Sequence, residues 1–285
     1  MVKVCIFFLN NLLIKTETNK IRIPISDIDV LLVNNYKCTI TSQLINKLTE
    51  NNILIIFCNN SYEPASICLP ISGNYNSLKI FQEQLNWRSN YKGYWWKQII
   101  KAKINNQANF LRNVLNKEEA FWELVNLMNN VTEFDVTNRE GHAAKIYWHN
   151  VYGINFKRHE EDYVNSLLNY GYTVLRGYFT RSIIKKGLDP RISLFHKSFD
   201  NFFALASDLM EPFRIIVDII VYKLFLKNTE NFYLDKQEII EFFNSKIKLN
   251  GLEHYINNAI DKFIDALINQ TEFPELNFDQ LYECV

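Results

Sequence analysis

The chain has few of the residues, glycine and proline, that interrupt helices and strands or dominate non-globular proteins. Its 285 residues include only eight glycines and six prolines, which excludes collagen-like and low-complexity proteins. Because 48% of the residues are hydrophobic, intrinsic disorder is excluded as well. The chain is long enough to bury a sizeable core in one or two domains.

Cysteines are few, and their spacing does not suit a structural role. There are five cysteines, an odd number, and no two of them have the Cys-x-x-Cys spacing. This argues against a zinc site and a disulfide scaffold, and favours a reducing cytoplasm. The first residues lack the basic start and cleavage site of a signal peptide. The longest apolar stretches, such as residues 215–226, contain charges and are too short to span a bilayer, so we expect a cytoplasmic protein without a membrane segment.

Net charge gives no guide to partners, because 31 Lys and Arg residues balance 31 Asp and Glu residues. A nucleic-acid site must therefore be local. Residues 84–117 meet this requirement, since they contain no Asp or Glu but seven Lys or Arg and several Trp and Tyr. The cations would bind phosphates, and the rings would stack on unpaired bases. The alternative is a helix that buries its aromatic side chains and leaves its cations in water.

Hydrophobic patterning predicts a small β domain over residues 1–72 that contains one helix. Short segments rich in Ile and Val indicate strands at residues 2–8, 11–15, 20–25, 27–34 and 52–58. Before the last of these, Thr41 begins a helical pattern. Since no glycine precedes Gly73, the turns must rely on asparagine, which tolerates a left-handed backbone. We interpret residues 64–76 as a linker.

Helical periodicity dominates the rest of the chain. It predicts two or three helices over residues 78–130 and one helix over each of residues 137–151, 161–186, 199–227 and 236–269. Pro190 marks a break between two of them. The expected fold class is therefore α+β, in which the small β domain is followed by a larger all-α domain over residues 73–285.

Acidic residues and a histidine in the helical half suggest a metal site. Asp208 and Glu211 are three residues apart, so a helix would place both carboxylates on one face. A divalent cation would relieve their mutual repulsion. Glu140 and the lone His196 are further candidates, and carboxylates with one imidazole suit Mg²⁺ or Mn²⁺.

Each candidate also has a plain structural interpretation. Glu140 follows Thr137 by three residues, which is the spacing of a capping box. Glu211 is placed to pair with Arg214 one turn later. His196 could be a half-buried histidine whose hydrogen bonds are satisfied.

Several stretches give the chain a resemblance to a known family. They are FDVTNREGHAAKIYW (residues 134–148), LNYGYTVLRGYFTRSIIKKGLDP (168–190), the lone His196 and ASDLMEPFRIIVD (206–218). In order and spacing they resemble the CRISPR-associated integrases, the catalytic subunits of the spacer-acquisition complex, and most closely those of type II-A systems. The resemblance covers most of the chain and is weakest after about residue 227.

The resemblance implies an N-terminal β domain and a helical catalytic domain, in agreement with the patterning. It implies that Glu140, His196 and Glu211 are catalytic and bind Mg²⁺ or Mn²⁺, with Asp208 as a possible neighbouring ligand. The segment PRISLFH (residues 190–196) departs from the family pattern, because it lacks a glycine two or three residues before the histidine.

By the same resemblance, the chain is expected to be a DNA integrase and endonuclease of antiviral defence. The 3′-hydroxyl of a short foreign DNA fragment would attack a phosphodiester at the edge of a CRISPR repeat. With water as the nucleophile, the same site would be an endonuclease. The alternative is a non-catalytic subunit that binds DNA ends and in which the acidic cluster is structural.

Cations near these motifs are expected to contact DNA phosphates. They are Arg139, Lys145, Arg176, Arg181, Lys185, Lys186, Lys197, Arg88, Lys92 and Lys97. Besides DNA, the resemblance implies a second copy of the chain, joined through the β domain, and a small ferredoxin-like subunit. In type II-A systems an RNA-guided nuclease and a ring-shaped accessory protein are further expected partners.

Overall fold

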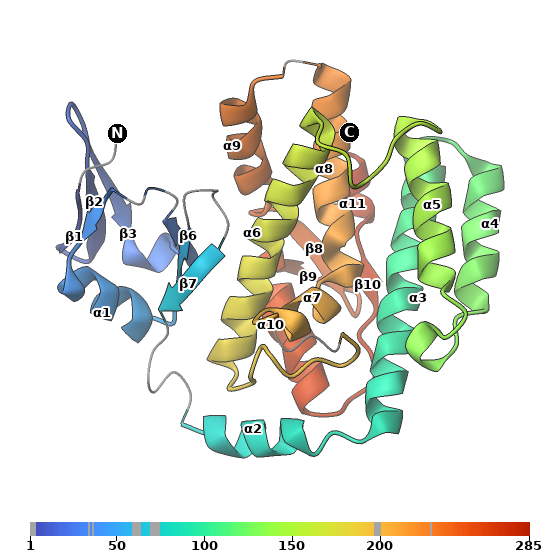
Figure 1. The fold of residues 1–285 in the computed structure, drawn as a ribbon, viewed down its shortest axis with the longest axis horizontal. Coiled ribbons are helices and arrows are strands. Elements are labelled where there is room, and N and C mark those ends of the chain that lie inside the picture. The colour runs from blue at the N-terminus through green and yellow to red at the C-terminus, as the bar shows by residue number, and fades with distance from the viewer. Residues whose placement is uncertain are drawn as a thin grey trace. The chain divides into compact units, whose positions relative to one another are not determined.

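The structure is a computed structural model that describes residues 4–33, 35, 37–58, 64–68, 75–196, 201–228 and 230–285. The chain divides into two compact units, Met1–Gln82 with Thr180–Leu188, and Glu83–Phe179 with Asp189–Val285. The strands of the first unit are blue in Figure 1, and most of the second unit is helical. A β-rich N-terminal part followed by a mostly helical part confirms the expected fold class.

Two small sheets are seen within the described residues of the first unit. In one, β1 (Val4–Phe8), β2 (Asn11–Lys15) and β3 (Lys20–Pro24) are antiparallel neighbours, and β5 (Thr39–Ile40) runs parallel to β1. In the other, β4 (Val30–Val33) is parallel to β6 (Leu54–Cys58), which is antiparallel to β7 (Pro64–Cys68). The 3₁₀ turn η1 (Ile25–Asp27) connects β3 to β4.

One helix supplies much of the core of this unit. In α1 (Ser42–Glu50), Leu44 and Leu48 are fully buried and pack in one cluster with Cys5, Leu12 and Ile55. The helix begins where the sequence indicates, because the Thr41 hydroxyl accepts a hydrogen bond from Leu44 N at 3.4 Å. Asparagine forms turns as expected, since Asn10 and Asn52 have φ angles of 58° and 56°.

The linker expected over residues 64–76 is partly wrong. Residues 64–68 form β7, whose Ile67 pairs with Ile56 of β6. A proline is tolerated here because Pro64 is the first residue of the strand, beside an irregularity in its register. Residues 69–74 lie outside the described residues. The first unit extends past residue 72 to Gln82. Within it, the backbones of Ser77 and Gly187 are so close that a Cβ at position 187 would lie 2.9 Å from Ser77 Cα.

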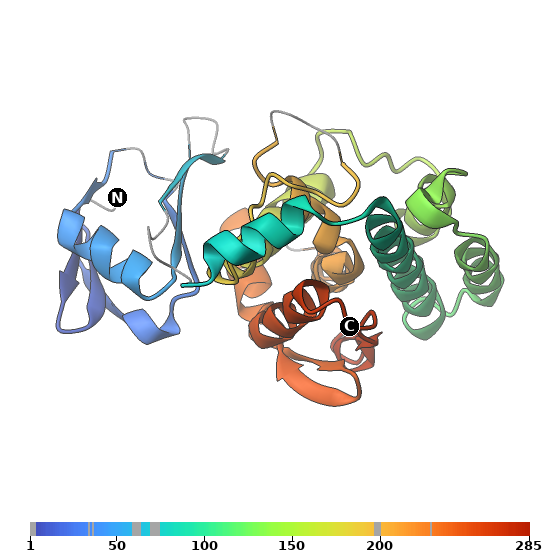
Figure 2. The same cartoon turned by 90° about the horizontal axis from the view of Figure 1, so that it is seen from below.

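Helices form most of the second unit. Three of them, α3 (Ser89–Asn113), α4 (Glu118–Asn129) and α5 (Arg139–Tyr152), contact one another and lie side by side in Figures 1 and 2. The others are α7 (Ala204–Leu209), α8 (Arg214–Lys227), α9 (Phe232–Phe242), α10 (Ile256–Ile268) and α11 (Asp279–Tyr282). Two helices, α2 (Ser77–Leu85) and α6 (Tyr163–Lys185), contribute residues to both units.

The single helix expected over residues 236–269 is wrong. The structure places a hairpin between α9 and α10, made of β8 (Lys246–Leu249) and β9 (Leu252–Tyr255), and β10 (Leu276–Asn277) adds to β8. The turn is Asn250-Gly251, and both residues have positive φ angles, 50° and 76°. Asn-Gly is the strongest short hairpin signal in a sequence, and here it overrides the helical periodicity on either side.

The helix expected over residues 199–227 is interrupted at Pro212. The helix α7 ends at Leu209, the 3₁₀ turn η3 (Glu211–Phe213) follows, and α8 starts at Arg214. Proline lacks an N–H group and cannot continue the hydrogen-bond pattern of the preceding helix. The interruption places Glu211 in a turn. Within the described part of the chain, no helix is long and apolar enough to cross a bilayer.

Candidate active site

Helix α3 runs through the middle of the site and contacts η3, α5, α7 and α8. Two of its polar residues, Lys103 and Asn106, are buried one turn apart. The side-chain amide of Asn106 donates to the carbonyl of Pro212 at 2.8 Å, which fixes η3 against α3. The ammonium of Lys103, one turn earlier on the helix, meets the acidic residues of the neighbouring elements.

Glu140 lies in the first turn of α5. The backbone N–H groups of Arg139 and Glu140 both donate to the carboxylate of Asp135, at 2.9 Å each. The residue that caps the helix is Asn138, whose side chain accepts from Gly141 N. The capping-box alternative is therefore not realised, and the Glu140 carboxylate instead contacts Lys103 Nζ through Oε1.

Glu211 is a buried carboxylate between two cations. Its Oε2 lies 2.6 Å from Lys103 Nζ, and its Oε1 lies 2.8 Å from the guanidinium of Arg214. The pairing with Arg214 that the spacing suggested is therefore present. Burial raises the pKa of Glu211, but Lys103 and Arg214 lower it by more, so that the net direction is downward and the carboxylate is charged at neutral pH.

His196 is held by Asp208. Its Nδ1 contacts Oδ1 of Asp208, and Oδ2 of the same carboxylate accepts from the backbone N–H groups of Leu194 and Phe195 at 2.8 Å each. A carboxylate that accepts from all these donors fixes the proton of the neutral imidazole on Nδ1 and leaves the lone pair on Nε2. The hydrogen bond from Asp208 raises the pKa of His196, and the charges of Glu211 and Glu140 act in the same direction.

Two further contacts hold the segment that carries His196. The Phe195 ring stacks on the buried ring of Trp96, with centroids 4.4 Å apart, and Trp96 also meets the His196 ring edge-on. The side-chain amide of Gln84 donates to the carbonyls of Asp189 and Ile192, at 2.9 Å each. These contacts hold the turn before His196, where the family pattern would have a glycine and this sequence has none.

The structure thus brings four of the sequence-derived residues to one cluster in the second unit. Glu140 and Glu211 share Lys103, and both carboxylates act electrostatically on His196. Asp208 has a different place from the one considered for it, because it is fully buried and its oxygens are occupied by His196 and backbone N–H groups. It orients the histidine.

The donor set fits a hard divalent cation in kind, but the carboxylates already share a cation. Among the described residues, no three His, Cys, Asp or Glu side chains are grouped closely enough to hold a metal ion. Glu211 Oε2 is buried and contacts Lys103, yet it makes no aligned hydrogen bond within the described chain. Two carboxylates around one positive charge, beside an imidazole whose Nε2 carries the lone pair, are the ligand types that Mg²⁺ and Mn²⁺ accept.

A hollow of about 960 Å³ opens at His196. It is lined by Trp87, Ser89, Lys92, Phe134, Arg191, Ile192, Ser193, Leu194, Phe195 and His196. Among the described residues, the lining contains cations and aromatic rings but no carboxylate. This side of the cluster therefore suits an anionic ligand.

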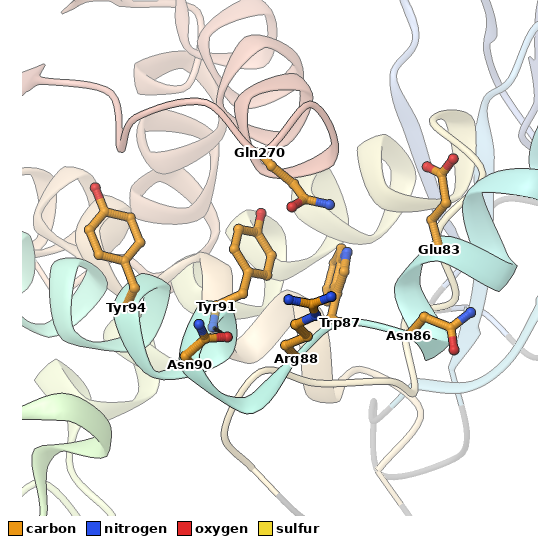
Figure 3. A pocket seen from close by; sticks show the side chains of 8 residues that line it. All are labelled: Glu83, Asn86, Trp87, Arg88, Asn90, Tyr91, Tyr94 and Gln270. Carbon is orange, nitrogen blue, oxygen red and sulfur yellow. Dashed lines mark hydrogen bonds between the residues drawn. The ribbon is translucent and has the colours of Figure 1, made fainter.

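A second hollow, of about 590 Å³, lies at the junction of α2 and α3 and shares Trp87 with the first. Figure 3 shows Tyr91 and Tyr94 projecting from the start of α3, with Arg88 beside Trp87 and with Gln270, two residues past the end of α10, near Tyr91. The alternative interpretation of the basic aromatic segment, a helix that buries its rings, therefore holds for part of the segment, while stacking of the other rings on bases stays a prediction. Trp95 and Trp96 are core residues, whereas the earlier rings line a surface.

The cations expected to contact DNA have several different surroundings. Arg88 and Lys92 line the two hollows, while Lys97 is half-buried on α3. Arg139 and Lys145 lie on α5. The guanidinium of Arg176 lies 4.9 Å from the ring centre of Phe203, and Lys185 ends α6 with Lys186 just after it. Lys197 lies outside the described residues.

Arg181 has a structural contact inside the first unit. Its guanidinium pairs with Asp29 at 2.9 Å and donates to the carbonyl of Asn52 at 3.2 Å. Its contact with DNA stays a prediction, as does that of the other nine cations.

Sequence reasoning missed the role of Lys103, which it counted only among the cations of the basic segment. Lys103 and Glu140 are separated by 37 residues, so no local spacing indicates their contact. The partner of His196 was also unassigned, although Asp208 lies only 12 residues away in the sequence. Neither contact can be derived from helical periodicity.

Comparisons with known proteins show the family to which the chain is related. Residues 9–240 match the family model described as CRISPR associated protein Cas1. A relative named CRISPR-associated endonuclease Cas1, from Neisseria meningitidis serogroup C, is 32% identical over 273 residues, which are 95% of this chain and 89% of the relative.

Two solved structures have a similar fold. A casposase bound to integration product has a TM-score of 0.77 at 18% identity, covering 98% of this chain and 93% of that chain. A chain of a Cas6-RT-Cas1–Cas2 complex has a TM-score of 0.73 at 17% identity, covering 95% of this chain and 34% of that chain. At these identities the likeness shows the fold.

Proposed function

The chain belongs to the Cas1 family of CRISPR-associated proteins, and from this premise we propose that it is a metal-dependent DNA endonuclease and integrase. It inserts short DNA fragments into a CRISPR array. The observation that carries the proposal is the cluster of Glu140, Glu211 and His196, contributed by three separate elements beside an open hollow. The relative from Neisseria, which is named as an endonuclease, supports it.

The reaction exchanges one phosphodiester bond for another. The 3′-hydroxyl oxygen of the fragment forms a bond to phosphorus, the bond from phosphorus to the 3′-oxygen of the repeat strand breaks, and the proton passes to solvent or to the leaving oxygen. Bond number is conserved, so the chemistry needs no ATP. When water replaces the hydroxyl, the product is a cut strand.

The protein's own residues prepare the site for this chemistry. Glu140 and Glu211 would provide the carboxylate oxygens that hold Mg²⁺ or Mn²⁺, and His196 would provide a neutral nitrogen ligand. When bound, the ion polarises the phosphoryl oxygen and stabilises the charge that develops there. Asp208 keeps the imidazole in the required tautomer. Arg214 holds the second oxygen of Glu211, which limits the rotation of that carboxylate.

The DNA and its partners are proposed to bind around this site. Lys92, in the hollow that contains His196, and Arg88, in the neighbouring hollow, hold phosphates of the strand next to the reacting bond. The remaining cations extend this contact. A second copy of the chain binds through the β-rich unit, and a small ferredoxin-like subunit joins the assembly. The Cas6-RT-Cas1–Cas2 complex, one chain of which has a similar fold, supports the proposal of a small partner subunit.

A joining assay tests the proposal. The protein, with and without its small partner, is incubated with a linear fragment and a supercoiled repeat plasmid in Mn²⁺ or in EDTA. We expect joined and relaxed products only with metal. Glu140→Gln, Glu211→Gln and His196→Ala should each lower the rate by at least about 100-fold, because each removes a ligand of the ion.

His142→Ala is the matched control, since His142 is an exposed histidine on α5, two residues after Glu140. It should keep the wild-type rate. Products that form in EDTA, or that persist in the three site variants, would refute the catalytic assignment. DNA binding by the wild-type protein without any joining, with its partner present, would favour the non-catalytic DNA-end-binding subunit.

A further inference from the structure

Lys103 is an unusual residue to find at the centre of this cluster. It is 9% exposed, and its ammonium contacts the carboxylates of Glu140 and Glu211, which come from two other elements. A lysine amine is ordinarily charged at neutral pH, and two carboxylates in direct contact favour the charged form. The two carboxylates thus converge on a single positive charge that belongs to the chain itself.

A charge count shows what this arrangement means for a metal ion. Glu140 and Glu211 contribute two negative charges, and Lys103 and Arg214 contribute two positive ones, so the four groups are already neutral. A divalent ion added without any rearrangement would leave two excess positive charges on these four groups, and the buried carboxylate of Asp208, beside His196, offsets only one of them. Such an excess is unfavourable because like charges repel.

Of the two cations, only Lys103 occupies oxygens of both carboxylates. Arg214 is bound to Oε1 of Glu211 alone, and no contact of it with Glu140 is seen among the described residues. An ion shared by the two carboxylates therefore has to take the contacts that the ammonium now makes. A lysine ammonium can leave them more readily than the planar, bidentate group of an arginine, because its stem is flexible and it binds as a point charge.

We propose that Lys103 is the resident counter-cation of the site and competes with the metal ion for the oxygens of Glu140 and Glu211, an inference that rests on the proposed metal-dependent function. In the metal-free protein, Lys103 keeps the two carboxylates together and charged. On metal binding, the ammonium leaves them, and its charge becomes available to a DNA phosphate. Lys103 is therefore a positioning residue whose loss strengthens metal binding.

Mn²⁺ binding to the full-length protein, measured by calorimetry, tests the competition. Lys103→Met retains the length and the apolar stem of the side chain but removes the charge. It should bind Mn²⁺ about tenfold more tightly than wild type or better, because the competing ion pair is gone. In EDTA its melting temperature should fall, and Mn²⁺ should raise that temperature by more than in wild type. Lys101→Met, two residues earlier on α3, should behave as wild type.

Chemical labelling of wild-type lysines gives a readout that does not depend on the folding of a variant. The protein is acetylated briefly in EDTA and in saturating Mn²⁺, and each lysine is quantified by mass spectrometry. Acetylation of Lys103 should rise several-fold with Mn²⁺, while that of Lys101 should not change. Unchanged or reduced labelling of Lys103 would overturn the inference.

The outcomes separate this inference from the proposed function. Binding of Mn²⁺ by wild type, with no tighter binding by Lys103→Met, overturns the role of Lys103 and leaves the metal site standing. No binding of millimolar Mn²⁺ by either protein overturns both. Tighter binding by Lys103→Met, lost again when Glu140→Gln is added, supports the competition at these carboxylates.

Discussion

Two buried carboxylates, one just before α8 and one in its second turn, contact different kinds of partner. Glu211, in η3 just before the helix, is 5% exposed and lies between the cations of Lys103 and Arg214. Asp218, in the second turn of α8, is 3% exposed and accepts hydrogen bonds from two phenols, Tyr147 of α5 and Tyr172 of α6.

The difference in partners sets opposite protonation behaviour. Burial raises the pKa of both groups. At Glu211 the two cations outweigh burial, and the pKa lies below its ordinary value. At Asp218 the tyrosine hydrogen bonds offset only part of the effect, and the pKa rises to about 6. Burial alone therefore does not determine the charge of a carboxylate, whereas the charge of its partner does.

The two regions also divide the work of the fold. The Glu211 cluster is charged, with two carboxylates and two cations in contact. The Asp218 cluster joins α5, α6 and α8 through neutral donors. Of these helices, α5 carries Glu140, and α8 begins three residues after Glu211. Gly171 permits the close approach of α6 to α8, because a Cβ at that position would lie 2.4 Å from the side chain of Val217.

The largest expected effect comes from removing the charge of Glu211. In EDTA, Glu211→Gln should lower the free energy of unfolding by about 3 kcal/mol or more, because two buried cations then share too few carboxylates. Urea unfolding at pH 7 measures it. Glu238→Gln breaks an ion pair of 2.6 Å with Lys227 at the surface and should cost no more than about 1 kcal/mol. Equal effects in the two variants would show that Lys103 and Arg214 do not depend on Glu211.

A pH series on Asp218 tests the other half of the comparison. Because the folded-state pKa is above the unfolded value of 3.8, the native state holds the proton more tightly, and stability falls as the pH rises from about 4 to about 6. A shift of this size corresponds to about 3 kcal/mol. Asp218→Asn mimics the protonated acid and removes this dependence.

The difference in unfolding free energy between Asp218→Asn and wild type should therefore be near zero at pH 4. It should grow in favour of the variant up to about pH 7 and then stay constant, as urea unfolding at each pH would measure. A variant that loses stability relative to wild type as the pH rises would contradict a raised pKa.

The sequence predicted much of the fold but less of these clusters. Segments rich in Ile and Val identified five strands of the first unit but not β5 or β7, and Thr41 marked the start of α1, because such signals are local. The Asn250-Gly251 turn was missed, since apolar residues at helical spacing continue on both sides of it. The sequence analysis also predicted one helix over residues 199–227, although Pro212 interrupts it with the turn η3.

The candidate ligands followed from resemblance, whereas their surroundings did not. Glu140, His196 and Glu211 come from motifs that can be read one at a time. The contact of Asn106 with Pro212 spans 106 residues, and that of Tyr147 with Asp218 spans 71. Such contacts depend on how helices pack, which periodicity does not specify, so the charge of each carboxylate could not be inferred in advance.

The smallest expected effects compare the two phenols that hold Asp218. The Tyr172 hydroxyl makes the closer contact, with Oδ1, while that of Tyr147 lies 3.1 Å from Oδ2. At pH 8, where Asp218 is ionised, Tyr172→Phe should cost about 2 kcal/mol and Tyr147→Phe about 1 kcal/mol, because each removes a hydrogen bond to a buried charge. The control Tyr233→Phe alters a tyrosine that is 72% exposed and should change little.

At pH 4 the protonated acid needs these donors less, so both costs should shrink. Each variant should also move the fall in stability to higher pH, since losing a donor raises the pKa of Asp218 further. If the two costs were equal at pH 4 and pH 8, the phenols would act by packing alone. Asp218 would then lack the polar neighbours that distinguish it from a carboxylate buried in a purely apolar core.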